Sequence, residues 1–105
     1  MAETTRHELL IGLHVEDEAS YARYRAGMTP LLEAVGGFFR YDWTIAAQLK
    51  GAADPPINRL FLISFPDEAT KEAFFADPAY LAVRAEHFQG AVASVERLAE
   101  YAHAG

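Results

Sequence analysis

The side chain best suited to proton transfer near neutral pH in this chain is the imidazole of His14, near the N-terminal end. Apolar alternation over residues 7–15 predicts a strand with Leu9 and Leu13 on one face and His14 on the other. A histidine that faces a cavity can act as a general acid or base. The alternative is a histidine at the rim of the fold, paired with Glu16 on the same strand face.

A second polar set alternates along residues 38–49, where Arg40, Asp42 and Thr44 are predicted to share one face of a long strand. If that face lines a cavity, the guanidinium of Arg40 can hold an anionic substrate. Asp42 is then the catalytic partner of His14, provided that the two side chains lie within hydrogen-bond reach. The alternatives are an ion pair at an interface between two copies of the chain, or exposure to solvent.

Two aromatic or polar sets are further candidates for contact with a substrate. Tyr41 and Trp43 fall on the other face of the same strand, and a shift of one residue would turn them toward the cavity instead. Tyr80, Arg84 and His87 follow one another at helical spacing and are expected on one helix face. That face is either a polar mouth of the cavity or an ordinary solvated surface.

We expect no cofactor and no metal site. The chain has no cysteine, and no two of its four histidines stand at the H-x-x-x-H spacing of a helical zinc site. The pair Gly36-Gly37 follows a helix and enters a strand, the reverse of the order in a phosphate-binding loop. Histidine, carboxylates and tyrosine are therefore the reactive groups that remain.

The first predicted helix begins after Asp17, whose carboxylate is a favoured cap, and ends at Gly36-Gly37, where one glycine adopts a left-handed conformation. Tyr21 and Tyr24 are expected in the core. Gly27 and Pro30 interrupt the helical pattern, so we expect a kink or a break near Met28.

The remaining elements follow from turn and cap signals along the rest of the chain. Asp67 and the Asp77-Pro78 pair predict the starts of two consecutive helical segments. The predicted ranges are a strand over 38–49, a loop over 51–56, a strand over 58–65, helix from 67 to about 89, a strand over 92–101 and a tail over 103–105.

The order β-α-β-β-α-β predicts an α+β protein with a ferredoxin-like sandwich, in which a four-stranded antiparallel sheet carries two helices on one face. We expect residues 1–105 to form this single domain. The strand over residues 58–65 is apolar on both faces, which makes an open sheet face costly in water. A homodimer that packs sheet against sheet is the expected solution.

The composition excludes several classes of protein. The chain of 105 residues carries a formal net charge of -6, and its nine basic residues are scattered, so we expect no nucleic-acid partner. Apolar runs are short, and we expect no membrane partner. The first residues show no leader pattern, and we expect a cytoplasmic protein.

Short motifs follow one another in a fixed order, namely Tyr21-x-x-Tyr24, Pro30, Gly36-Gly37, Phe65-Pro66 and Asp77-Pro78-x-Tyr80. In this order they resemble the domain of unknown function 1330 family, which belongs to the dimeric α+β barrel superfamily, and the resemblance covers residues 8 to 98. It implies a ferredoxin-like protomer and a dimer, and no established reaction. Phe38, Lys50 and His87 depart from the polar residues that relatives tend to carry at those places.

Two hypotheses about function follow. The first is a homodimer that binds a small molecule in a cavity between sheet and helices or between the two sheets, without a reaction of its own. The alternative is a cofactor-independent isomerase- or monooxygenase-like enzyme that acts on a small hydrophobic or anionic substrate.

Overall fold

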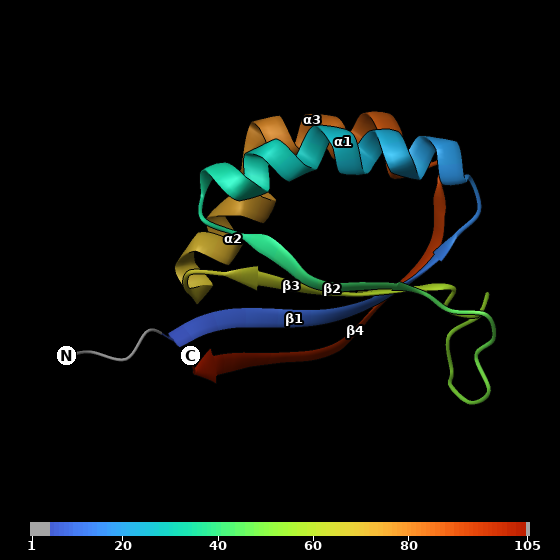
Figure 1. Cartoon of the computed structure of the whole chain (residues 1–105). Coiled ribbons are helices and arrows are strands. Elements are labelled where there is room, and N and C mark those ends of the chain that lie inside the picture. Colours follow the sequence, from blue (N-terminus) through green and yellow to red (C-terminus); the bar gives the residue numbers. More distant parts are fainter. Residues whose placement is uncertain (1–4, 105) are drawn as a thin grey trace.

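The first strand, β1 (Thr5–Val15), lies between two other strands in the middle of the sheet. Its alternation is the predicted one, because Leu9, Leu13 and Val15 are buried on the face that the helices cover. Figure 1 shows this arrangement, with all helices on one side of the sheet and the other side open.

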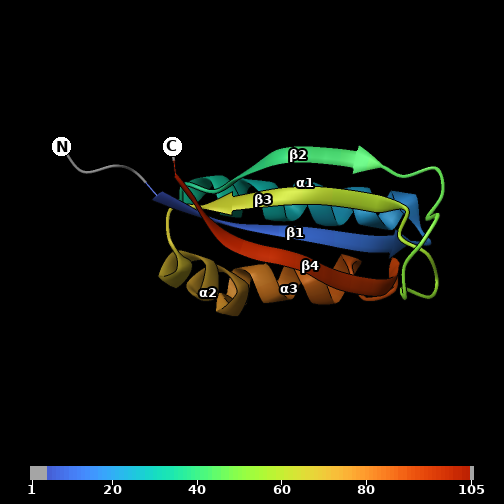
Figure 2. The ribbon, with the colours of Figure 1, turned by 90° about the horizontal axis from the view of Figure 1, so that it is seen from below.

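The computed structural model describes residues 5–104; Met1–Thr4, where the absence of a leader was predicted, and Gly105 lie outside this range. The strands run in the order β2-β3-β1-β4, and every neighbouring pair is antiparallel. This is the predicted ferredoxin-like α+β sandwich (Figure 2). After β1 come α1 (Glu18–Ala34), β2 (Phe38–Thr44), β3 (Arg59–Phe65), α2 (Glu68–Ala76), α3 (Pro78–His87) and β4 (Val92–Ala104).

α1 begins as predicted, with the Asp17 carboxylate accepting a hydrogen bond from the Ser20 backbone N–H at 3.0 Å. The predicted break near Met28 is absent, since the helix continues through Pro30 to Ala34. Met28 lies before this proline and Leu32 after it, and both are buried against the sheet. Packing on both sides of Pro30 therefore outweighs the loss of one backbone hydrogen bond.

Turn residues set the helix ends. Gly36 has a φ of 82°, the left-handed conformation expected after a helix, and the N–H of Gly37 donates to the Leu32 carbonyl. The predicted caps Asp67 and Asp77 accept hydrogen bonds from Thr70 N–H and Ala79 N–H. The second helical stretch is thus two helices, and it ends at His87, two residues before the predicted end.

β2 differs most from its prediction, because it ends at Thr44 and not at Leu49. Beyond Ile45, which still bonds to the Asn58 carbonyl, the chain turns into a loop. The Gln48 side chain organises this loop by donating to the Gly51 and Ala53 carbonyls and accepting from Ile57 N–H. The alternation of side-chain types on which the prediction rested continues past residue 44, but the strand pairing between β2 and β3 ends there.

A bulge in β2 changes which residues share a face. Phe39 pairs with Ile63 and Tyr41 with Leu62, so Arg40 is an extra residue between them. The predicted common face of Arg40, Asp42 and Thr44 is therefore wrong. Arg40 lies on the open face, whereas Asp42 and Thr44 point to the helix side.

β4 is longer than predicted and includes the residues assigned to a tail. His103 pairs with Arg6 and Ala104 with Thr5, because β1 is long enough to offer partners up to that point. Within the predicted part of β4, Glu100 lies beside Leu9 on the helix side and Tyr101 beside Glu8 on the open face. None of the helices described is long and apolar enough to cross a membrane.

Candidate functional site

A cavity of about 350 Å³ lies between the helices and the sheet. Its floor comes from β1, β2, β3 and β4, and its roof comes from α1, α2, α3 and the turn that follows α3. Most of its wall is apolar, and the polar side chains in it are two tyrosines and three arginines. The lining residues are Leu9, Ile11, Leu13, Tyr24, Arg25, Met28, Phe39, Phe61, Ile63, Phe75, Tyr80, Arg84, Phe88, Val95 and Arg97.

Tyr24 from α1 and Tyr80 from α3 meet at the cavity, with their hydroxyl oxygens 2.8 Å apart. Tyr24 stacks on Tyr21, and both are buried, as predicted for core aromatics. Burial, followed by the neighbouring Tyr80 hydroxyl, raises the pKa of Tyr24 well above its ordinary value. Tyr24 therefore stays protonated at neutral pH and takes part in the pair through a hydrogen bond.

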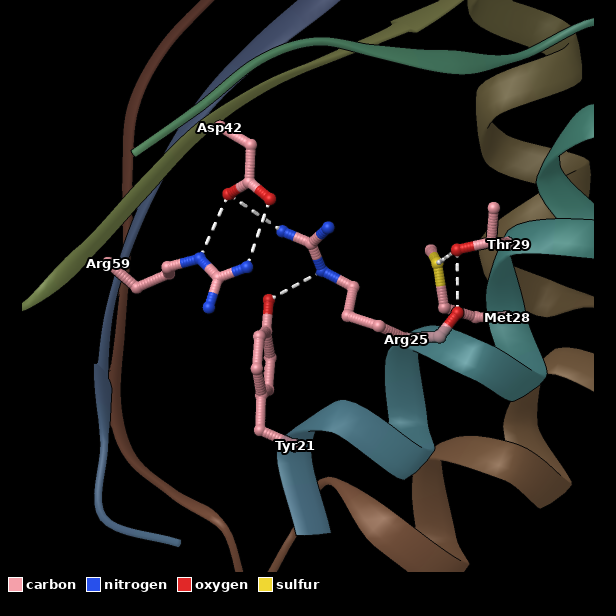
Figure 3. Close-up of polar contacts among 6 residues, drawn as sticks. All are labelled: Tyr21, Arg25, Met28, Thr29, Asp42 and Arg59. Atoms are coloured by element: carbon pink, nitrogen blue, oxygen red, sulfur yellow. Dashed lines mark hydrogen bonds and ion pairs between the residues drawn. The ribbon is translucent and has the colours of Figure 1, made fainter. Parts of the chain in front are cut away.

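Arg25 crosses one side of the cavity from α1. Its guanidinium lies 3.8 Å from the centre of the Phe39 ring, and its Nε–H donates to the Tyr21 hydroxyl at 2.8 Å. A second donor of Arg25 reaches an oxygen of Asp42 at 3.1 Å. Arg59 donates to both oxygens of the same carboxylate at 2.9 Å, as Figure 3 shows.

Asp42 is thus shared between two arginines. Burial alone would raise the pKa of Asp42, but the hydrogen bond from Arg59 and the charge of Arg25 outweigh it and hold the pKa below its usual value. Asp42 is therefore an ionised positioning group for Arg25 and Arg59. No hydrogen bond joins it to His14 within residues 5–104.

The other two arginines stand on α3 and β4. The Arg84 guanidinium lies 4.8 Å from the centre of the Phe88 ring, and no ion pair of Arg84 forms within the described part of the chain. Arg97 donates to Glu100 at 2.8 Å and is largely exposed. The ammonium of Lys71 also lies 2.8 Å from a Glu100 oxygen, so Arg97 and Lys71 share the Glu100 carboxylate.

Glu100 binds three side chains on the helix side. Besides Lys71 and Arg97, the Nε2–H of His7 donates to Glu100 at 2.5 Å. The hydrogen bonds from Lys71 and His7 lower the pKa of Glu100 to about 2. Glu68 brings a further carboxylate within 4.8 Å of the His7 and Glu100 ligand atoms. Lys71 binds the same Glu100 oxygen as His7, so the cluster is described as an ion-pair network.

The predicted site residues divide between the two sides of the sheet. Tyr80 and Arg84 line the cavity, and Asp42 holds a lining arginine. His87 follows them on α3 but does not line the cavity. The Nε2 atom of His87 lies 3.8 Å from a carboxylate oxygen of Glu86, and the backbone carbonyl of His87 accepts a hydrogen bond from the Ser20 hydroxyl.

His14 lies away from the helix-side cavity. Its Nδ1–H donates to the Pro56 carbonyl at 2.6 Å, and Ser94, which pairs with it on β4, donates to the Pro55 carbonyl at 3.2 Å. The described partner of His14 is therefore a loop carbonyl and not Glu16. These two bonds attach the loop between β2 and β3 to the open face, and the catalytic role of His14 stays a prediction.

Arg40, Tyr41 and Trp43 lie on the open face. Arg40 donates to Glu8, which is fully buried and also accepts from the Tyr101 hydroxyl at 3.2 Å. Burial alone would raise the pKa of Glu8, yet the bonds from its partners, Arg40 first, lower it. Tyr41 and Trp43 stack with their ring centres 5.2 Å apart and are largely exposed.

A second hollow of about 420 Å³ is found beside these residues on the open face, between the β2–β3 loop and β4. Leu60 and Leu98 form part of its wall, and Lys50 and Glu96 are its charged residues. This hollow lies where a cavity between two sheets was predicted as the alternative location.

Two arginines of the helix-side cavity were missed by the sequence analysis. Arg25 stands four residues after Tyr21, a spacing that places both on one face of α1. Arg97 alternates with Val95 along β4 and so faces the cavity with it. The signal at Arg25 is a charged residue beside the apolar face of an amphipathic helix.

Comparison with known proteins agrees with this architecture. Residues 9–101 match the family described as domain of unknown function (DUF1330). No curated protein matches the chain.

Solved structures with a similar fold come from a bacterium and a plant. The crystal structure of RPA0582, a protein of unknown function from Rhodopseudomonas palustris, superposes with a TM-score of 0.76 at 19% identity and covers 94% of this chain and 81% of its own. The methylated form of RPA0582 gives a TM-score of 0.72 at 20% identity, with 99% and 82% covered. The solution structure of a hypothetical Arabidopsis thaliana protein gives 0.53 at 15% identity, with 100% and 93% covered.

Proposed function

Since the chain belongs to the DUF1330 family, whose description names no reaction, we propose from its geometry that the protein is a homodimer that binds a small molecule in the cavity between helices and sheet. The observation that carries the proposal is the cavity itself. An apolar space of about 350 Å³ with a few convergent polar groups is typical of a ligand site.

The polar groups of the cavity are held in place by their own contacts. Tyr24 and Tyr80 hold each other by a hydrogen bond, and Tyr21 and Asp42 orient Arg25. Side chains with fixed orientation lose little conformational entropy when a ligand binds, which favours affinity. The arrangement supports binding, and no described contact of His14 or Asp42 favours the enzyme alternative.

A thermal-shift screen tests binding. Compounds of ten to fourteen non-hydrogen atoms, such as naphthalene derivatives, should raise the melting temperature, because a ligand that binds only the native state stabilises it. In the variant Val95→Phe, a larger side chain occupies part of the cavity, and the shift should disappear. Val95 is 51% exposed, so the substitution leaves the core intact.

Val35→Phe is the matched control. Val35 is 37% exposed and lies at the end of α1 outside the cavity, so this variant should keep the full ligand-induced shift. A shift that survives Val95→Phe, or a screen without any shift, would contradict binding in this cavity.

The open sheet face supports the homodimer. Large apolar side chains are exposed there on the two edge strands β2 and β4, namely Phe38, Tyr41, Trp43, Leu98 and Tyr101. Figure 2 shows the strands that carry them, with no helix in front. The half-buried Leu10, Leu60 and Leu62 of the inner strands lie between these edges. Large exposed apolar surface on a small protein marks an interaction site. Because the Glu8–Arg40 pair within this face is already satisfied, a second copy can cover it without leaving a buried charge unpaired.

The dimer is tested by the mass in solution. Leu98→Glu puts a charge on the open face and should convert a dimer into a monomer in sedimentation equilibrium. Leu81→Glu is the control, since Leu81 is 46% exposed on α3 and Leu98 is 50% exposed on β4. A monomeric mass of the unmodified chain at micromolar concentration would overturn the dimer.

A further inference from the structure

We propose that the ligand of the helix-side cavity carries a carboxylate on an apolar body of roughly a dozen non-hydrogen atoms, and that Arg84 and Arg97 receive the carboxylate. This inference rests on the proposed function, because it names the class of molecule that the same cavity takes. Three observations lead to it: the charge of the lining, the hydrogen-bonding capacity of the tyrosine pair and the size of the cavity.

The charge of the lining has one sign. Three arginines face the cavity, and its described lining contains no aspartate or glutamate, although the chain as a whole has a formal charge of -6. Arg25 shares the single carboxylate of Asp42 with Arg59. Arg97 shares Glu100 with Lys71. Two guanidinium groups therefore share one carboxylate at Asp42, whereas the Glu100 group also has the carboxylate of Glu68 close by. The lining cation without a carboxylate partner within residues 5–104 is Arg84, and an anion would compensate its charge.

Arg84 is the group best placed to bind that anion. It is half-buried, its guanidinium lies against the Phe88 ring, and it forms no ion pair within residues 5–104. A partly buried cation without a carboxylate keeps most of its attraction for an incoming one, because the low dielectric of the cavity screens it less than water does. The planar guanidinium also matches a carboxylate with two parallel hydrogen bonds.

The tyrosine pair offers a further donor on the same helix face. Tyr80 precedes Arg84 by four residues, so both side chains project from one face of α3. When one hydroxyl of the Tyr24–Tyr80 pair donates to the other, the acceptor's own proton is left for a third group. A ligand oxygen is a suitable acceptor for this proton.

The volume of the cavity and its apolar wall determine the size and the polarity of the rest of the ligand. A dry cavity of about 150 Å³ holds a benzene molecule, so a volume of about 350 Å³ fits roughly twice as many atoms. Leu9, Phe61 and Ile63 on the sheet side offer only apolar surface. A singly charged carboxylate costs less to desolvate here than a doubly charged phosphate. An aromatic or branched aliphatic acid meets these conditions.

Pairs of acid and amide test the charge requirement with the shape held constant. Binding of 2-naphthoate and 2-naphthamide, and of cinnamate and cinnamamide, is measured by isothermal titration at pH 7.5 with the full chain. We expect each acid to bind at least tenfold more tightly than its amide. Raising the salt concentration should weaken the acids and leave the amides unchanged.

Arginine variants locate the carboxylate. Arg84→Gln should weaken the acids about tenfold and leave the amides unchanged, and Arg97→Gln should weaken the acids less, because Arg97 is 61% exposed. Arg23→Gln removes the same charge from the exposed outer face of α1 and should change nothing. Far-UV circular dichroism verifies that each variant is folded, and Arg97→Gln serves as the second test if Arg84→Gln does not fold.

The outcomes separate the inference from the function on which it rests. Equal affinity of acids and amides overturns the carboxylate and leaves binding in the cavity standing. Tighter binding of the acids that neither Arg84→Gln nor Arg97→Gln reduces overturns the assignment of these arginines. If none of the four compounds binds and the wider thermal-shift screen is also negative, the proposed function fails, and this inference fails with it.

Discussion

The two faces of the sheet are built from the same four strands but carry their polar groups in different ways. On the helix side, charged groups sit around a cavity, and two carboxylates, Asp42 and Glu100, are each shared by more than one cation. On the open side, Glu8 and Arg40 form a pair that Tyr101 completes. The helix side keeps unsatisfied positive charge, and the open side keeps unsatisfied apolar surface.

This difference assigns the two proposed kinds of binding to opposite faces of the sheet. Excess charge beside an empty apolar space favours a small ligand, whereas exposed aromatic surface with satisfied charges favours a second protein surface. Residues that are adjacent in a strand contribute to opposite faces of the sheet, because successive side chains point in opposite directions. Leu9 is buried under the helices, for example, and its neighbour Leu10 is only half-buried on the open face.

Truncation of Leu9 and Leu10 to alanine should give the largest measurable difference between the two faces. In the Leu98→Glu background, which removes the proposed dimer, Leu9→Ala should lower the free energy of unfolding by about 3 kcal/mol, because it leaves a hole in the core. Leu10→Ala should cost about 1 kcal/mol, because its side chain is already partly in water. Urea unfolding measures both, and equal losses would show that the two faces are not differently buried.

The charge pair of the open face gives the next largest effect. Glu8→Gln should lower the free energy of unfolding at pH 7 by about 2 kcal/mol, since the buried side chain loses the charge that Arg40 and Tyr101 bind. Glu96→Gln, on the same face, is the control and should cost much less. A similar loss in both variants would mean that the Glu8–Arg40 pair contributes no specific stability.

The pH dependence of stability should reveal the helix-side network through Glu100. Its pKa of about 2 lies below the ordinary value of 4.5, so its contribution is complete above pH 4.5 and is lost as the pH falls toward 2. Glu100→Gln should therefore lose less stability between pH 5 and pH 3 than the unmodified chain. Glu72→Gln, an exposed carboxylate on α2, should keep the original slope, and the reverse ranking would contradict the network.

Much of the fold could be predicted because the deciding signals are local. Asp17, Asp67 and Asp77 cap helices through bonds to backbone groups two or three residues away. Gly36 ends α1 through its own backbone conformation. Such interactions depend on neighbours in the sequence and so are visible in it.

The candidate site was predicted less well because its contacts join distant residues. The bulge at Arg40 depends on how β2 pairs with β3, and because of it Arg40 and Asp42 lie on opposite faces of the sheet. Asp42 finds Arg25 and Arg59, each seventeen positions away, and these partners follow from packing alone. His14 was assigned to the correct strand, but its partner Pro56 lies in a loop whose path the sequence does not specify.

The order of the elements, their caps and the apolar face of each were determined by the sequence alone, because periodicity and turn chemistry act over a few residues. Which polar residues surround the cavity was decided only by the tertiary structure. The packing of α1, α3 and β4 brings Arg25, Arg84 and Arg97 to one cavity. The extra residue in β2 places Arg40 on the other face of the sheet. Strand register and helix packing depend on the whole chain, and so does the chemistry that they assemble.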